Sequence, residues 1–267
     1  MAETKNRYDQ LIERIFLQHY KPGTRKVIFQ RKDMEATAKS LRIELPKNLG
    51  DIIYSFRYRT GLPEAIAKKA PVGHEWVIRS AGVSKYRIEL SKIANFTPSE
   101  SLMTIKVPDA TPGIIAKYAF DDEQAILAKI RYNRLVDIFT GVACYSLQNH
   151  LRTTVRGIGQ VECDEIYLGI DKHGVHYVFP IQAKGGRDKL GIVQIEQDFA
   201  MCAEKFPDTI GRPLAAQFIG SETIVLFEFG MTDEGVRIAA ERHYRLVDPQ
   251  TISEAELREY RKNTRDQ

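Results

Sequence analysis

The chain has 267 residues, which is enough for one large or two small domains that each bury a core. Its 39 lysines and arginines against 35 aspartates and glutamates give a formal net charge of +4, which suits a polyanionic partner without identifying one. Three scattered cysteines argue against a disulfide framework or a zinc site, and no apolar run resembles a membrane span or a signal peptide. These features predict a cytoplasmic protein with buried, reduced thiols and no membrane partner.

Apolar residues at helical spacing predict three helices in the first sixty residues. The first covers about residues 5–20 and is stopped by the following proline and glycine. A short strand is expected at residues 27–29, and Asp33 is predicted to be the N-cap of the second helix. The third helix places four apolar side chains on its inner face, namely Leu49, Ile52, Ile53 and Phe56.

Two short strands are predicted at residues 75–79 and 85–89, with a turn at Gly82 between them. Three helices followed by a β-hairpin resemble, in element order, a winged helix-turn-helix domain, whose third helix enters the major groove of DNA. The side chains expected to contact DNA in this region are Lys47, Asn48, Arg57, Arg59, Arg79, Lys85 and Arg87. Two alternatives stay open: these side chains also fit a solvated helix face, and the domain also fits a dimerisation or peptide-binding module.

Residues 96–120 are rich in Pro, Thr and Ser and predict a connector that contains one strand, at residues 101–107. A long helix is predicted over residues 121–140. Its apolar pattern continues over residues 142–151 after an interruption at Gly141, so a helix is expected there too.

The rest of the chain predicts strands and one further helix. Strands are expected at residues 161–171, 176–184, 216–219 and 223–229, and the helix at residues 192–205. The strand at residues 216–219 is expected to run parallel to the one at 179–183, because a helical crossover joins them. Residues 234–242 fit a strand or a loop, and the end of the chain fits a surface helix or a fraying tail.

The strands at residues 161–171 and 176–184 predict a hairpin closed by a three-residue loop. That register opposes Asp164 to Gln182 and Glu162 to Lys184, and Cβ atoms of directly opposed residues lie about 4.5–5.5 Å apart. Pro180 has no N–H to donate, so a bulge there is an alternative that changes the register. Another alternative is an ordinary hairpin with a solvated outer face.

Carboxylate and amide oxygens are hard ligands suited to Mg²⁺, and a neighbouring lysine stabilises the negative charge that develops in phosphodiester hydrolysis. Asp164, followed by Gln182-Ala183-Lys184 on the next strand, resembles the PD-(D/E)XK nuclease superfamily, in the branch in which Gln replaces the first acidic residue. The resemblance implies that Asp164, Gln182 and Glu162 hold Mg²⁺ and that Lys184 assists the attacking water.

The same resemblance implies further residues and an activity. Gln148 is the candidate for a polar residue on the preceding helix that approaches the metal, and Arg187 is expected to contact the phosphate backbone. The implied enzyme is a Mg²⁺-dependent endonuclease, of the type II restriction class, that cuts double-stranded DNA as a homodimer. The alternatives are a DNA repair or junction-resolving nuclease of the same fold, and a winged-helix transcription regulator without catalysis.

The expected fold class is α/β, of the α+β type, with two domains. Residues 1–95 are predicted to form the winged-helix domain and residues 96–120 the connector. Residues 121–250 are expected to form a restriction-endonuclease-like mixed sheet flanked by helices, and residues 251–267 a charged tail.

Overall fold

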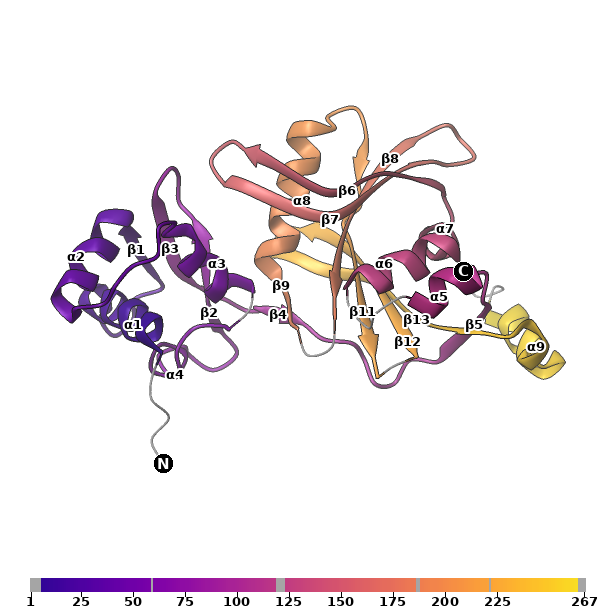
Figure 1. Cartoon of the computed structure of the whole chain (residues 1–267), viewed down its shortest axis with the longest axis horizontal. Helices are drawn as coiled ribbons and strands as arrows, with labels where there is room; N and C mark the ends of the chain where they lie inside the picture. The colour runs from indigo at the N-terminus through magenta and orange to yellow at the C-terminus, as the bar shows by residue number, and fades with distance from the viewer. Residues whose placement is uncertain (1–5, 59, 119–122, 186–187, 221, 264–267) are drawn as a thin grey trace. The chain divides into compact units, whose positions relative to one another are not determined.

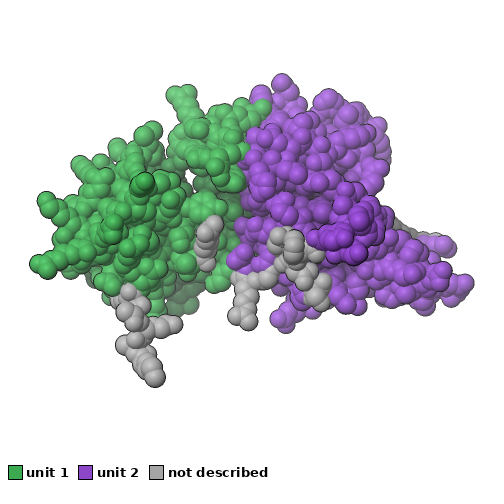
Figure 2. Space-filling view, in the orientation of Figure 1, with its two compact units in different colours: residues 1–97, 152–162, 189–205 green, residues 98–151, 163–188, 206–267 purple. Residues whose placement is uncertain are grey.

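A computed structural model describes residues 6–58, 60–118, 123–185, 188–220 and 222–263. The chain divides into two compact units, which Figure 2 colours separately. Unit 1 comprises Met1–Thr97, Arg152–Glu162 and Lys189–Lys205, and unit 2 comprises Pro98–Leu151, Cys163–Asp188 and Phe206–Gln267. The first division lies close to the boundary predicted at residue 95. Two later segments also belong to unit 1, so the predicted division of the chain into consecutive domains does not describe the units fully.

Unit 1 begins with helices and short strands in the predicted order (Figure 1). They are α1 (Arg7–His19), β1 (Lys26–Gln30), α2 (Arg31–Leu41), α3 (Gly50–Tyr58), α4 (Glu64–Ala67), β2 (Glu75–Ser80) and β3 (Lys85–Ser91). The strands form an antiparallel sheet in the order β1-β3-β2, and Gly82 has a φ of 112° in the turn between β2 and β3. Helices followed by such a hairpin are the element order of a winged helix-turn-helix domain.

The apolar stripe of α1 lies at the centre of the unit 1 core, where Trp76 of β2 meets it. Trp76 packs edge-on against Phe16, with ring centroids 5.0 Å apart. The inner face predicted for α3 is confirmed, since its apolar side chains are all buried in this core. Helical periodicity therefore predicts the helical part of this core, to which the strands add Val27, Phe29, Trp76, Ile78 and Ile88.

The predicted N-cap of α2 is wrong. The helix begins at Arg31, so Gln30 is its N-cap and Asp33 is the third helical residue. The Asp33 carboxylate accepts a hydrogen bond from the backbone N–H of Gln30 at 2.7 Å. Asp33 therefore forms one half of a capping box, which places an acidic residue three positions after the cap.

Unit 1 also contains three later elements. They are β4 (Asn95–Phe96), β9 (Leu190–Gly191) and α8 (Ile192–Lys205), and α8 covers the residues predicted for it. β4 pairs antiparallel with β9, and the backbone N–H of Ile192 donates to the carbonyl of Ala94 at 2.9 Å. Hydrogen bonds thus join the start of α8 to the segment that follows the β2–β3 hairpin.

Unit 2 is built on a mixed sheet. Its elements are β5 (Thr104–Pro108), α5 (Gly113–Tyr118), α6 (Glu123–Tyr132), α7 (Leu135–Thr140), β6 (Ala143–Val155), β7 (Gly159–Ile170), β8 (His176–Lys184), β10 (Ile210–Gly211), β11 (Leu214–Ile219), β12 (Thr223–Thr232), β13 (Gly235–Val247), a 3₁₀ turn (Pro249–Thr251) and α9 (Glu254–Asn263). The strand order is β5-β13-β12-β11-β8-β7-β6, with β10 beside β8. The predicted parallel pairing of β11 with β8 is confirmed, and β5 also runs parallel to β13.

The helix predicted over residues 142–151 is wrong, because this segment lies in strand β6. α7 ends at Gly141, which adopts the left-handed conformation with a φ of 68°. Val142 and Cys144 are buried while Ala143 between them is exposed, and alternation of this kind is typical of a strand. The ends of β6 and β7 at their mutual turn belong to unit 1.

The long helix predicted over residues 121–140 is divided in two at Arg134, whose φ is 50°. The strand predicted within the connector is confirmed as β5, which joins the unit 2 sheet. The ambiguous segment at residues 234–242 is strand, in β13. α9 is a surface helix, and the Tyr260 hydroxyl on it accepts from the backbone N–H of Lys106 at 3.0 Å.

The three cysteines are free and buried, as predicted. Burial raises the pKa of the Cys202 thiol to about 12 and that of Cys144 to about 11. Both side chains are therefore protonated thiols at neutral pH. None of the helices in the described part of the chain is long and apolar enough to cross a membrane.

Candidate functional site

The β7–β8 hairpin adopts the register that its loop length predicts. Residues 165–170 pair with residues 176–181, and no register shift occurs at Pro180. The bulge considered there is therefore wrong. Continuing the same register by one residue opposes Asp164 to Gln182.

Asp164 is held against the backbone of β8. Its Oδ2 accepts a hydrogen bond from the N–H of Ala183 at 2.8 Å. Ala183 lies in the apolar core, so the flanking side chains of Gln182 and Lys184 start on the other face of the strand. Gln182 is 2% exposed and Lys184 is 8% exposed, so both faces of β8 are buried. The alternative of a solvated outer face is wrong.

The lysine of this motif lies near a carboxylate that the sequence pattern does not single out. Lys184 Nζ lies 3.9 Å from Oε1 of Glu123, the first residue of α6. α6 packs against β8 and β11, which explains how a residue sixty-one positions earlier reaches this strand. Gln148, the candidate for a polar residue on the preceding helix, lies on β6 and is exposed.

Glu162 and Asp171 have partners of their own. Glu162 belongs to unit 1, where its Oε2 lies 2.9 Å from a guanidinium nitrogen of Arg152. The Asp171 carboxylate accepts from the backbone N–H groups of Val175 and His173, at 3.0 and 2.8 Å. These hydrogen bonds, that of Val175 first, lower the pKa of Asp171. Asp171 is a turn residue, as predicted.

A buried carboxylate lies next to Asp164 on the opposite face of β7. Glu165 is fully buried, and its Oε1 accepts from Arg131 of α6 at 2.8 and 2.9 Å and from the Ser146 hydroxyl at 2.6 Å. Its Oε2 and the buried hydroxyl of Tyr167 have no hydrogen-bond partner among the described residues. Burial, reinforced by the charge of Glu165, raises the pKa of Tyr167. The Arg131–Glu165 pair ties α6 to β7, the elements that carry Glu123 and Asp164.

The oxygen donors carried by α6, β7 and β8 are of the type that one class of metal ion prefers. The candidate ligands are carboxylate and amide oxygens: Asp164 and Gln182 are opposed on the β7–β8 hairpin, and Glu123 lies on α6, beside Lys184. Mg²⁺ takes one or two protein carboxylates and keeps several waters, so this set fits Mg²⁺, whereas zinc sites use His and Cys. No group of three or more His, Cys, Asp or Glu side chains with the spacing of a metal site occurs within the described ranges.

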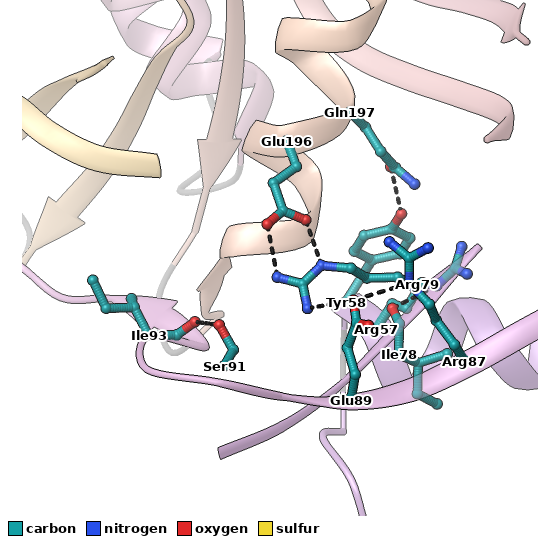
Figure 3. Close-up of polar contacts among 10 residues, drawn as sticks. All are labelled: Arg57, Tyr58, Ile78, Arg79, Arg87, Glu89, Ser91, Ile93, Glu196 and Gln197. Atoms are coloured by element: carbon teal, nitrogen blue, oxygen red, sulfur yellow. Dashed lines mark hydrogen bonds and ion pairs between the residues drawn. The ribbon is translucent and has the colours of Figure 1, made fainter. Parts of the chain in front are cut away.

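In unit 1, three arginines expected to contact DNA have partners within the protein (Figure 3). Arg79 donates to both oxygens of Glu196 on α8, at 2.6 and 2.7 Å, and to Glu89 at 3.2 Å. Arg87 donates to the same Glu89 oxygen at 2.9 Å. Arg57 donates from Nε to the carbonyl of Ile78 at 3.1 Å.

The electrostatics of Arg79 follow from this pairing. Its side chain is 13% exposed, and burial alone lowers the pKa of a guanidinium. The hydrogen bonds and charge of Glu196 outweigh burial and raise the pKa of Arg79. A second bond joins α3 to α8, from the Tyr58 hydroxyl to Oε1 of Gln197 at 2.7 Å (Figure 3). Burial raises the pKa of Tyr58, so this hydroxyl remains a donor.

The other expected DNA contacts divide into two groups. Lys47 and Lys85 are exposed to solvent. Asn48 is exposed too, but it acts at the start of α3, where its Oδ1 accepts from the N–H of Gly50 and its Nδ2 donates to Asp51. The remaining two candidates, Arg59 and Arg187, lie outside the described residues.

Comparison with known proteins adds no relative. No protein-family model matches this sequence, and searches of curated proteins and of solved structures gave no significant match.

Proposed function

We propose that this protein is a Mg²⁺-dependent endonuclease that hydrolyses phosphodiester bonds in duplex DNA. The observation that carries the proposal is the end of the β7–β8 hairpin. There Asp164 is held against β8 beside Gln182, and the buried ammonium of Lys184 has the Glu123 carboxylate 3.9 Å away. Burying an amide and an amine costs free energy, so a strand retains them where they have a use.

Each side chain has a distinct role in the proposed reaction. Asp164 and Gln182 supply oxygens that hold Mg²⁺, and Glu123 is a further carboxylate beside Lys184. Bound Mg²⁺ lowers the pKa of a coordinated water and polarises the phosphate. Lys184 orients the attacking water and stabilises the extra negative charge on the phosphate oxygens. Glu162 is left out of this ligand set because it is paired with Arg152.

The order of secondary-structure elements along the chain supports the same proposal. A helix, three successive antiparallel strands and a second helix, followed by a strand parallel to the third, are what a PD-(D/E)XK-like core implies. Here these are α6, β6 to β8, α8 and β11. Cutting both strands of a duplex would favour a homodimer with two such sites. A repair or junction-resolving nuclease shares the same site and differs only in substrate.

One observation favours a second candidate, a DNA-binding regulator without catalysis. Unit 1 has the element order of a winged helix and contains 23 lysines and arginines against 14 aspartates and glutamates. A regulator, however, has no use for a buried lysine beside a carboxylate and an amide.

The test is a digest of plasmid and phage DNA with Mg²⁺. We expect discrete cutting by the wild type and none by Asp164→Ala or Lys184→Ala. Lys172→Ala is the matched control, because Lys172 is an exposed lysine in the turn of the same hairpin. Glu123→Gln is expected to slow cutting by about 10²-fold or more, the effect of losing one group that stabilises developing charge. Circular dichroism verifies that each variant is folded.

Two results contradict the proposal. Equal cutting by the wild type and both alanine variants removes the site assignment. If the folded wild type binds duplex DNA but cuts none of it, with Mg²⁺ or Mn²⁺, the nuclease proposal is ruled out and the regulator becomes the better candidate.

A further inference from the structure

The basic side chains of unit 1 fall into two classes. Arg57, Arg79 and Arg87 are hydrogen-bonded within the protein, and Glu89 and Glu196 neutralise the last two. Five of the exposed basic residues that have no ion pair among the described residues lie together along α2 and the start of β3. This set is Arg31, Lys32, Lys39 and Arg42 of α2 and its C-cap, together with Lys85 at the start of β3. We call it the α2–wing surface.

The four α2 residues lie on one side of the helix. At 100° per residue they fall within an arc of about 100°, from Arg31 to Lys32. On the same wheel the buried side chains of the helix, Met34, Thr37 and Ala38, occupy an adjoining arc of about 100° that does not overlap the basic one. Arg31 and Arg42 are eleven residues apart, so the row is about 16 Å long.

Lys85 extends this row because β1 leads directly into α2. Gln30, the residue before α2, pairs with Lys85 across the β1–β3 ladder. The backbone N–H of Arg31 donates to the carbonyl of Ser84 at 3.0 Å, so the wing turn adjoins the start of the helix. Glu35 is the exposed acidic residue within the arc.

The formal charge of the chain is divided unevenly between the two units. Unit 1, with 23 basic and 14 acidic residues, has a net charge of +9. Unit 2 contains 16 lysines and arginines against 21 aspartates and glutamates, a net charge of −5. Attraction for a polyanion therefore resides in unit 1, and within it the unpaired cations are those that a phosphate can reach.

We propose that duplex DNA docks on the α2–wing surface through its phosphates, and that the outer face of the β2–β3 hairpin is not the DNA-contacting face. The inference rests on the proposed function and specifies where that enzyme holds its substrate. One strand of B-DNA has a phosphate about every 3.4 Å, so a 16 Å row spans about five of them.

The alternative face is unsuited to phosphate because Arg79 is already bound. A phosphate that reached Arg79 would have to displace two carboxylates, leaving Glu196 and Glu89 without a cation beside the DNA. Figure 3 shows the guanidinium of Arg79 directed at Glu196. Phosphate contact at Arg31 or Lys85 breaks no existing ion pair in the described structure.

The test measures binding of a fluorescein-labelled 24-base-pair duplex by fluorescence anisotropy, in EDTA so that no cutting occurs. The first variant is Arg31→Gln with Lys32→Gln, and its control is Lys172→Gln with Lys262→Gln, which changes the net charge equally at exposed lysines of unit 2. Losing two phosphate contacts lowers the slope of log Kd against log salt by about 1.8. The advantage of the wild type over the first variant then shrinks about tenfold between 50 and 200 mM salt.

A charge change of the opposite sign makes the test specific. Glu35→Gln is expected to tighten binding about threefold, since it removes one unfavourable charge from the row. Its control, Glu100→Gln, removes an exposed carboxylate of unit 2 and is expected to leave Kd unchanged.

The outcomes separate this inference from the nuclease proposal. Equal Kd and slope for the wild type and the Arg31/Lys32 variant overturn the docking surface, even if the wild type cuts DNA. The expected binding pattern in a protein that never cuts supports the surface and overturns the nuclease. Weakening of equal size in the Lys172/Lys262 control shows general charge attraction and also overturns it.

Discussion

Replacing Arg131 by methionine is expected to destabilise unit 2 far more than its position suggests. Arg131 is 36% exposed, and surface ion pairs contribute only about 0–1 kcal/mol. Its partner Glu165, however, is fully buried. Methionine keeps the length of the side chain but leaves the carboxylate without its cation, and its Oε2 already has no hydrogen-bond partner among the described residues.

The expected loss is about 3–5 kcal/mol, the cost of leaving one partner of a buried ion pair uncompensated. Glu165→Gln is expected to cost less, about 1–3 kcal/mol, because the stranded partner is then a guanidinium that reaches water and Asn149. The double variant is expected to recover part of the loss. The structure thus predicts an order of stability in which Arg131→Met is lowest.

Chemical denaturation measures these differences with two probes. Trp76 is the chain's one tryptophan and lies in the unit 1 core, so its fluorescence reports unfolding of unit 1. Far-ultraviolet circular dichroism reports both units. The midpoint by circular dichroism should fall in the Arg131 variant. The tryptophan midpoint should stay unchanged if the units unfold separately.

A control and a refutation follow from the same geometry. Arg134→Met removes an arginine that is 65% exposed and paired with Asp137, so its effect should stay within about 1 kcal/mol. If Arg131→Met is as stable as that control, or more stable than Glu165→Gln, then the Glu165 carboxylate is solvated in the variant. That result would refute the reasoning.

Three further predictions concern packing, pH and the Arg79 ion pairs. Gly169→Ala should cost about 1–3 kcal/mol in denaturant unfolding, because a Cβ there comes within 2.8 Å of the Phe179 ring. The pKa of Glu256 is lowered to about 2, first by the hydrogen bond from Lys106, so the attachment of α9 should weaken as pH falls from 4.5 toward 2, which faster amide exchange in α9 would reveal. Arg79→Gln should lower the tryptophan-detected stability of unit 1 by about 1–3 kcal/mol while DNA affinity stays unchanged.

Local patterns in the sequence predict the hairpin at the candidate site because few registers satisfy them. A three-residue loop and strict alternation of apolar residues fix the pairing of residues 165–170 with 176–181. Pro180 does not disturb it. The same reasoning predicts α8 over residues 192–205, where the apolar period and the flanking glycine agree.

The helix prediction for residues 142–151 is wrong for a physical reason. A short apolar run with a few polar residues fits both periods, and the preceding helix biases the choice. What decides the structure is the left-handed Gly141, after which the chain leaves the helix axis and pairs with β7. Glycine near the end of a helical pattern signals a C-cap, so the end of α7 could have been predicted from the sequence.

The partners of charged residues cannot be predicted from local sequence patterns. Arg79 and Glu196 are separated by 117 positions, and Lys184 and Glu123 by sixty-one. Nothing local distinguishes an arginine that binds a carboxylate from one that binds a phosphate, since both are oxygen anions with matching geometry. The sequence therefore predicts basic residues on the β2–β3 hairpin, but it does not show which of them lack a carboxylate partner and can bind a phosphate.

The opposite net charges of the two units explain why the proposed enzyme needs both. Unit 2, which contains Asp164, has a formal net charge of −5. A phosphate that approaches Asp164 therefore meets net repulsion at long range. At 0.1 M salt that repulsion is screened beyond about 10 Å, and inside this distance the nearby cations decide the outcome. Lys184 is one such cation, and in the proposed enzyme Mg²⁺ on the carboxylate and amide oxygens would supply the other. Affinity for DNA must then come from unit 1, which is why changes on α2 should alter binding, whereas changes at Asp164 should alter cutting.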